Sequence, residues 1–200
     1  MTSKLSPRIA LIIIAGLFVL PLALAWLMYS GAIDYQPAET RNLGALVEPP
    51  VPAAIESLAV RDINGQAASD WSEHWMVLYA TPEPCGADCL ADAEGLRQVH
   101  RAAGRNQQRI RLLLLGPGAQ SQSGALGELY PAFLLATDPG GSVSAALDAV
   151  SAAQGAATPG SLYLLDPLGN IMMFYAAGFD PNDLKKDLKR LLTWSKLDEQ

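Results

Sequence analysis

Apolar residues fill one continuous stretch near the N-terminus and alternate with polar residues over the remaining chain. The stretch extends from Ile9 to Tyr29 and contains no charged residue. As a helix with a rise of about 1.5 Å per residue it is roughly 30 Å long, which matches the hydrocarbon core of a bilayer. We therefore expect one transmembrane helix over residues 9–29, in which Pro21 is tolerated.

The charges on either side of this stretch predict its orientation. Lys4 and Arg8 precede it, and the next cation is Arg41. The positive-inside bias then places residues 1–8 in the cytoplasm and the rest of the chain outside, in the periplasm of a bacterium with two membranes. A cleavable signal peptide is the alternative, because Ala23 and Ala25 form a small-x-small site. Both alternatives export the remaining chain.

Prolines mark the segment that follows the apolar stretch. Pro37, Pro49, Pro50 and Pro52 interrupt regular structure, so residues 30–52 are expected to form a semi-extended linker. Residues 53–200 have the length of one domain that buries its own core. The net charge of −6 offers no basic surface, which excludes nucleic acid as an expected partner.

Apolar runs with strand and helix periodicity divide the domain into regular elements. The first half predicts a strand or hairpin at Ile55–Ile63, a buried strand at Trp75–Thr81, a helix at Cys89–Ala103 and a strand at Arg109–Leu115. The strand, helix and strand form a unit with parallel pairing. Glycines and polar residues between Gly116 and Gly124 predict a mobile surface loop, since the lysine of a phosphate loop is missing.

The second half of the domain changes from parallel to antiparallel character. Its predicted elements are a strand at Phe133–Thr137, a helix at Ser142–Ala153, a hairpin of Ser161–Leu165 and Ile171–Ala176, and a helix that begins at Asp180 and Pro181. This order is typical of a thioredoxin-like fold. The predicted class is α/β, a thioredoxin-like domain with a central mixed sheet flanked by helices, preceded by one transmembrane helix.

The candidate chemistry lies with Cys85 and Cys89, the chain's two cysteines. They occupy the junction between the buried strand and the next helix, where free N–H groups and the helix dipole favour a thiolate. Three intervening residues put their Cα atoms about one turn apart, within the range that a disulfide requires. Cys85 lies at the helix entry and Cys89 one turn inside, so we expect Cys89 to be more buried, Cys85 to attack and Cys89 to resolve.

A purely structural disulfide is the alternative for this pair, because exported proteins contain many such bridges. Two features oppose it: the bridge closes a very small loop, and it lies where redox and soft-metal sites are built. Glu83 and Asp88 flank the pair and oppose thiolate formation. We expect both acids to be solvated.

Three stretches resemble one known family. The segments MVLYATPEPCGADCL, ATPGSLYLLDPLGNI and DPNDLKKDLKRLL, within Ile55 to Leu192, are similar to the Sco/SenC group of thioredoxin-like cytochrome oxidase assembly proteins. They are more similar still to a group of membrane-anchored proteins encoded with cytochrome c oxidase genes in proteobacteria. The resemblance implies cytochrome c oxidase subunits, or another assembly factor, as partners.

The chain departs from the Sco pattern at the copper site, where that family binds copper through two cysteines and a histidine just before the hairpin. Thr158-Pro159-Gly160 takes that place here, and His74 and His100 are each expected about 16 Å from the cysteines. Two thiolates remain for Cu(I), at Cys85 and Cys89. Pro159 resembles the proline that faces the cysteines in thioredoxins.

Three hypotheses therefore stand for the function. The chain assists oxidase assembly through thiol–disulfide exchange or Cu(I) handling, or it is a general thiol–disulfide oxidoreductase, or it is a non-catalytic binding module whose disulfide staples a helix. One further expectation concerns packing: Met172 and Met173 are adjacent on one predicted strand and should point to opposite faces of the sheet.

Overall fold

The computed structural model describes residues 6–30 and 42–195, which belong to two compact units that divide after Arg41. The first unit contains helix α1, Pro7–Tyr29, which begins after Ser6 and continues through Pro21. Its large apolar side chains between Ile9 and Leu27 are exposed. Within the described residues this is the one helix long and apolar enough to cross a membrane, as the sequence predicts.

The second unit is built on a seven-stranded mixed sheet. In spatial order the strands are β1 (Ala45–Pro52), β7 (Asn170–Tyr175), β6 (Leu162–Leu165), β3 (Trp75–Ala80), β4 (Ile110–Leu115), β5 (Phe133–Thr137) and β2 (Ala59–Asp62). The central pairs β3–β4 and β4–β5 are parallel, and every other neighbouring pair is antiparallel. The predicted change from parallel to antiparallel pairing is confirmed.

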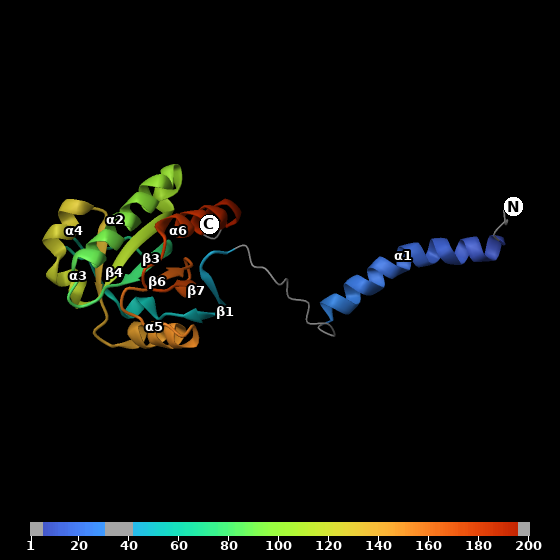
Figure 1. Ribbon diagram of the computed structural model, residues 1–200, viewed down its shortest axis with the longest axis horizontal. Helices are drawn as coiled ribbons and strands as arrows, with labels where there is room; N and C mark the ends of the chain where they lie inside the picture. Colours follow the sequence, from blue (N-terminus) through green and yellow to red (C-terminus); the bar gives the residue numbers. More distant parts are fainter. Residues whose placement is uncertain (1–5, 31–41, 196–200) are drawn as a thin grey trace. The chain divides into compact units, whose positions relative to one another are not determined.

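Helices cover both faces of this sheet (Figure 1). Helices α2 (Ala87–Ala102) and α6 (Pro181–Trp194) lie on one face and α5 (Ser142–Ala153) on the other. The short helices α3 (Pro117–Ser121) and α4 (Ser123–Leu129) follow β4, and the 3-10 turns η1 (Ile55–Ser57) and η2 (Gly104–Arg109) complete the elements. The thioredoxin-like α/β class with helices on both faces is confirmed.

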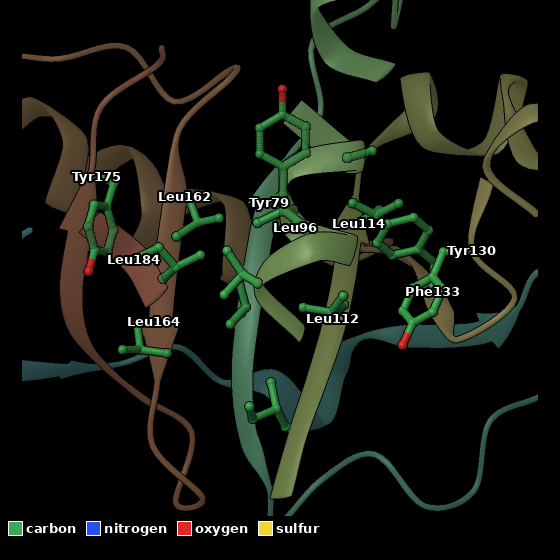
Figure 2. Close-up of a cluster of buried hydrophobic side chains, with 14 of the residues drawn as sticks. Tyr79, Leu96, Leu112, Leu114, Tyr130, Phe133, Leu162, Leu164, Tyr175 and Leu184 are labelled. Carbon is green, nitrogen blue, oxygen red and sulfur yellow. The ribbon is translucent and has the colours of Figure 1, made fainter. Parts of the chain in front are cut away.

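Strand β3 shows why an uninterrupted apolar run predicts a central strand. Val77 and Tyr79 belong to the core beneath α2 and α6, whereas Met76 and Leu78 belong to the core beneath α5. Successive side chains point to opposite faces, and both faces are covered, so every position is buried. Figure 2 shows the core beneath α2 and α6, in which Tyr79 of β3 lies beside Leu96 of α2.

The predicted linker over residues 30–52 is wrong at its C-terminal end. Strand β1 pairs with β7, with Leu46 opposite Met173 and Val51 opposite Ile171. Pro49 and Pro50 lie in the irregular part between these pairs, and an edge strand accepts residues without an N–H because one side has no partner strand. Lys4, Arg41 and the part of the linker at residues 31–41 lie outside the described residues.

Two further predictions are corrected by the packing. The expected surface loop contains α3 and the start of α4, and Gly118 and Ala119 are buried. Met172 and Met173 both pack against the core beneath α2 and α6. A register shift opposite Leu164 and Leu165 leaves Met172 as an extra residue, and such a bulge breaks the alternation of side chains.

Candidate functional site

The cysteine pair lies where β3 leads into α2. A short loop connects Ala80 at the end of β3 to Gly86, the N-cap residue of α2. No side chain forms a capping hydrogen bond at this end of the helix. Cys85 and Cys89 form a disulfide with their Cα atoms 5.2 Å apart. The spacing predicted from one helical turn is therefore confirmed, and Cys85 lies just before the helix while Cys89 lies in its first turn.

Both cysteines are buried. Cys85 is 1% exposed and Cys89 3% exposed, so the expectation that Cys89 is the more buried residue is wrong. Helix α3 packs against the loop before Cys85. A Cβ atom added to Gly118 would lie 2.1 Å from the Pro82 carbonyl oxygen and 3.3 Å from the Cβ of Cys85.

Thr81 connects the end of β3 to β4 and α3, and it is a site residue that the sequence patterns did not predict. Its hydroxyl donates to the carbonyl of Leu115 at 2.9 Å and accepts from the N–H of Ala119 at 3.2 Å. Thr81 thus connects the end of β3 to the end of β4 and to α3. The available signal was a polar residue at the end of the apolar run Trp75–Thr81.

Acidic groups surround the first turns of α2. Glu83 and Asp88 are exposed, as predicted. Asp92, one turn after Cys89, accepts a hydrogen bond of 2.7 Å from the buried hydroxyl of Tyr79. Burial raises the pKa of Asp92, and the nearby charge of Asp88 adds to this. Burial, followed by the contact with Asp92, raises the pKa of Tyr79.

The two histidines lie at the opposite end of the sheet from the cysteines. The Nε2–H of His100 donates to the carbonyl of Ile110, the first residue of β4, at 3.3 Å. His74 directly precedes β3, and its Nε2 accepts from Arg111 at 2.9 Å. Because β3 and β4 are parallel and the cysteines follow the far end of β3, about 16 Å of strand separates them.

Pro159 lies in the loop before β6, close to the end of β3. The N–H of the next residue, Gly160, donates to the carbonyl of Ala80 at 2.7 Å. Pro159 itself is exposed, and the cis peptide bonds of the described residues precede Pro49 and Pro84 rather than Pro159. That Pro159 faces the cysteine pair remains a prediction.

The donor set at this site is two sulfur atoms. No group of three or more histidine, cysteine or carboxylate residues suited to a metal ion occurs in residues 6–30 and 42–195. Oxidised, the sulfurs form a disulfide that accepts two electrons and two protons. Reduced, they supply the soft thiolate ligands that Cu(I) prefers.

A buried cysteine pair at the strand-to-helix junction of a mixed sheet defines a thioredoxin-like protein, here with an N-terminal apolar helix. The chain belongs to the family described as "Transmembrane-like, thioredoxin-like, C-terminal domain", whose model matches residues 75–195. No curated protein sequence matches the chain.

Solved structures show the same fold. Copper-bound ScoI from Arabidopsis thaliana is 13% identical, with a TM-score of 0.50 over 76% of this chain and 99% of that one. Copper-bound Sco1 from yeast is 14% identical, with a TM-score of 0.50 over 78% and 96%. A DsbF homologue from Corynebacterium diphtheriae is 16% identical, with a TM-score of 0.52 over 78% and 97%. At these identities the likeness concerns the fold.

Proposed function

We propose that this chain is a membrane-anchored thiol–disulfide exchange protein whose reactive groups are Cys85 and Cys89. The observation that carries the proposal is the Cys85–Cys89 disulfide at the N-terminus of α2. The helix terminus stabilises a thiolate at this position, and two cysteines one turn apart interconvert between dithiol and disulfide with little backbone movement. Cys85 attacks, Cys89 resolves, and Pro159 faces the pair.

The proposed process is assembly of cytochrome c oxidase. The chain would keep thiols of the oxidase copper site reduced, with oxidase subunits or another assembly factor as partners. The Sco/SenC resemblance of the segments around Cys85 and Pro159 supports this, as does the shared fold with copper-bound Sco proteins. We further infer that the chain belongs to the membrane-anchored proteins encoded with oxidase genes in proteobacteria, with α1 in the inner membrane and the domain in the periplasm.

Cu(I) handling is a second candidate for the same pair. Two adjacent thiolates are soft ligands, which favour Cu(I) over Cu(II). The place of the third Sco ligand is taken by Thr158-Pro159-Gly160, and His74 and His100 are engaged elsewhere. A site of two thiolates should therefore hold Cu(I) more weakly than a complete Sco site.

A non-catalytic role is favoured by one observation, the burial of both cysteines. A buried bridge that staples the start of α2 to the loop before it needs no chemistry. The reduction potential separates the two roles, because structural disulfides have potentials below about −300 mV.

The test equilibrates the purified protein with dithiothreitol redox buffers and quantifies the Cys85–Cys89 dithiol. A reduction potential above about −300 mV supports exchange chemistry, and a much lower potential supports a purely structural disulfide. The oxidase assignment has its own test, in which the gene is deleted and cytochrome c oxidase activity is measured. Wild-type protein should restore that activity, whereas Cys85→Ser and Cys89→Ser should not.

A further inference from the structure

We propose that the segment Gly116–Gln122, which contains α3, is a cover over the Cys85–Cys89 disulfide and that Thr81 is the residue that holds it closed. A thiol of a dithiol partner reaches Cys85 only when this cover opens. The biological meaning of the cover rests on the proposed function, but its existence does not.

Burial shows that the closed site is inaccessible. Thiol–disulfide exchange requires in-line attack of a thiolate on one sulfur, so the attacked sulfur must be reachable. At 1% and 3% exposure neither cysteine meets this requirement in the structure. The exposed neighbours Gly86 and Asp88 show that the surrounding surface is open to solvent, so the obstruction is local.

The close approach of Gly118 identifies α3 as the obstruction. A Cβ atom at this position would overlap the Pro82 carbonyl oxygen at 2.1 Å and would touch the Cβ of Cys85 at 3.3 Å. Only glycine permits this contact, because the main chain of α3 lies directly against the loop that carries Cys85. Next to it, Ala119 is fully buried in the same core as the cysteines.

Thr81 forms the connection that keeps α3 in place. Its hydroxyl bridges the Leu115 carbonyl and the Ala119 N–H, at 2.9 and 3.2 Å. The Leu115 carbonyl also accepts from the N–H of Thr81, so it has a partner without the hydroxyl. The Ala119 N–H belongs to the first turn of α3, where no intrahelical acceptor is available. Thr81 supplies that acceptor.

The cover can open at low cost. Helix α3 has five residues, and helices of this length are marginal without tertiary contacts. It begins after Gly116, whose φ of +125° is accessible to glycine and strained for other residues. Opening would separate α3 from the loop at Pro82 and leave the central sheet intact.

The reaction of the open state follows ordinary exchange chemistry. A thiolate of the partner attacks the sulfur of Cys85, the S–S bond breaks, and Cys89 leaves as a thiolate that takes up a proton. The second thiolate of the partner then attacks the mixed disulfide and releases Cys85, which is also protonated. The partner becomes a disulfide, and two electrons and two protons have reached the pair.

The test measures the rate of disulfide reduction in the full-length protein in detergent micelles, with excess dithiothreitol as the dithiol. Thr81→Val keeps the shape and removes the hydroxyl, so reduction should accelerate about tenfold, the effect of one lost hydrogen bond. Gly118→Ala, which forces α3 away from Pro82, should accelerate it as well. Thr81→Ser retains the hydroxyl and should react like wild type.

Val150→Ala is the matched control, because Val150 lies on α5 in the core on the other face of the sheet. It destabilises the domain without touching the cover, so its reduction rate should stay within about twofold of wild type. Equal acceleration in Val150→Ala and Thr81→Val would show reduction through general unfolding and would overturn the proposal. So would wild-type and Thr81→Val proteins that react equally fast.

The outcomes for cover and function are separable. If the reduction potential of the pair shows a purely structural disulfide while Thr81→Val still accelerates reduction, the exchange function is contradicted and the proposal of a cover is supported. If the potential supports exchange but Thr81→Val has no effect, the cover fails and the function stands.

Discussion

The carboxylate of Asp187 on α6 accepts a hydrogen bond of 2.9 Å from the N–H of Gly44, directly before β1. It also accepts from the N–H of Leu43 at 2.8 Å and from the hydroxyl of Tyr175 at 3.0 Å. Asp187 is 1% exposed, so these donors replace the water that a carboxylate would otherwise bind. Burial, and then the charge of Asp187, raise the pKa of Tyr175. The contact attaches the first strand to the last helix.

Removal of this carboxylate should destabilise the domain. In Asp187→Ala the buried N–H of Gly44 and hydroxyl of Tyr175, together with the part-buried N–H of Leu43 and the guanidinium of Arg190, lose their acceptor, and we expect the free energy of unfolding to fall by about 3 kcal/mol. Chemical denaturation followed by far-UV circular dichroism measures it. Asp183→Ala is the control, because Asp183 pairs with Lys186 at the surface and should change stability by less than about 1 kcal/mol. Equal losses in the two variants would contradict the assigned role of Asp187.

Acidification should weaken the fold through His100. Its Nδ1 accepts from the Tyr130 hydroxyl at 2.8 Å, while its Nε2–H donates to the Gln107 carbonyl at 3.1 Å, and both contacts suit the neutral ring. Burial lowers the pKa of His100 in the folded state below its usual value. The unfolded chain therefore binds the proton more readily, and stability is lost as pH falls from about 6.5 toward the lower folded pKa.

The measurement compares unfolding free energies at pH 7.5 and pH 5.5. Wild type should lose stability between the two, and His100→Gln should lose less. His100→Gln should also cost about 1–3 kcal/mol at pH 7.5, because buried partners of the ring lose their hydrogen bonds. His74→Gln serves as the control for the other histidine. An unchanged pH dependence in His100→Gln would show that other groups cause the loss.

Once the disulfide is reduced, Cys85 should be alkylated before Cys89. Both cysteines are buried in the disulfide form, so the order depends on thiolate formation. Cys85 precedes α2, where the free N–H groups and the dipole of the helix favour a thiolate, whereas Cys89 lies within the first turn. Brief treatment of the reduced protein with iodoacetamide, followed by peptide mapping, gives the order. Preferential labelling of Cys89 would reverse the proposed attacking and resolving roles.

Copper binding should depend on the two cysteines and on neither histidine. Reduced wild-type protein should take Cu(I) from a competing chelator, more strongly as pH rises, because each thiol must lose its proton before it binds. Cys85→Ser and Cys89→Ser should abolish this, and His74→Ala and His100→Gln should leave it nearly unchanged. Absence of Cu(I) uptake by the wild type would remove the copper candidate and leave the exchange reaction.

The proposed topology predicts the behaviour of reporter fusions. Alkaline phosphatase, which needs export, should be active when fused after Gln200, and a cytoplasmic reporter at the same position should be inactive. The physical basis is Lys4 and Arg8 before the apolar stretch. A signal peptide would give the same fusion result but a shorter, soluble product, which membrane fractionation and N-terminal sequencing detect.

Local sequence patterns determined most of the regular elements. The strand Phe133–Thr137 and the helix Ser142–Ala153 have the predicted limits, and α6 begins at Pro181 with Asp180 accepting from the N–H of Asn182. These elements depend on side-chain periodicity and on capping groups close in sequence, which a single sequence displays. The spacing of Cys85 and Cys89 was predictable for the same reason, since one helical turn sets it.

Contacts between distant segments were decided only by the tertiary structure. The prolines of β1 predict a linker when the segment is considered alone. The residues that order it as a strand, its partners in β7 and Asp187 on α6, lie more than a hundred residues away in the sequence. The burial of Cys85 likewise depends on Gly118, a residue that looked like part of a surface loop. The composition of a segment predicts the structure that it favours in isolation. An edge strand or a five-residue helix is stabilised mainly by packing against other parts of the chain, and these contacts form only in the folded protein.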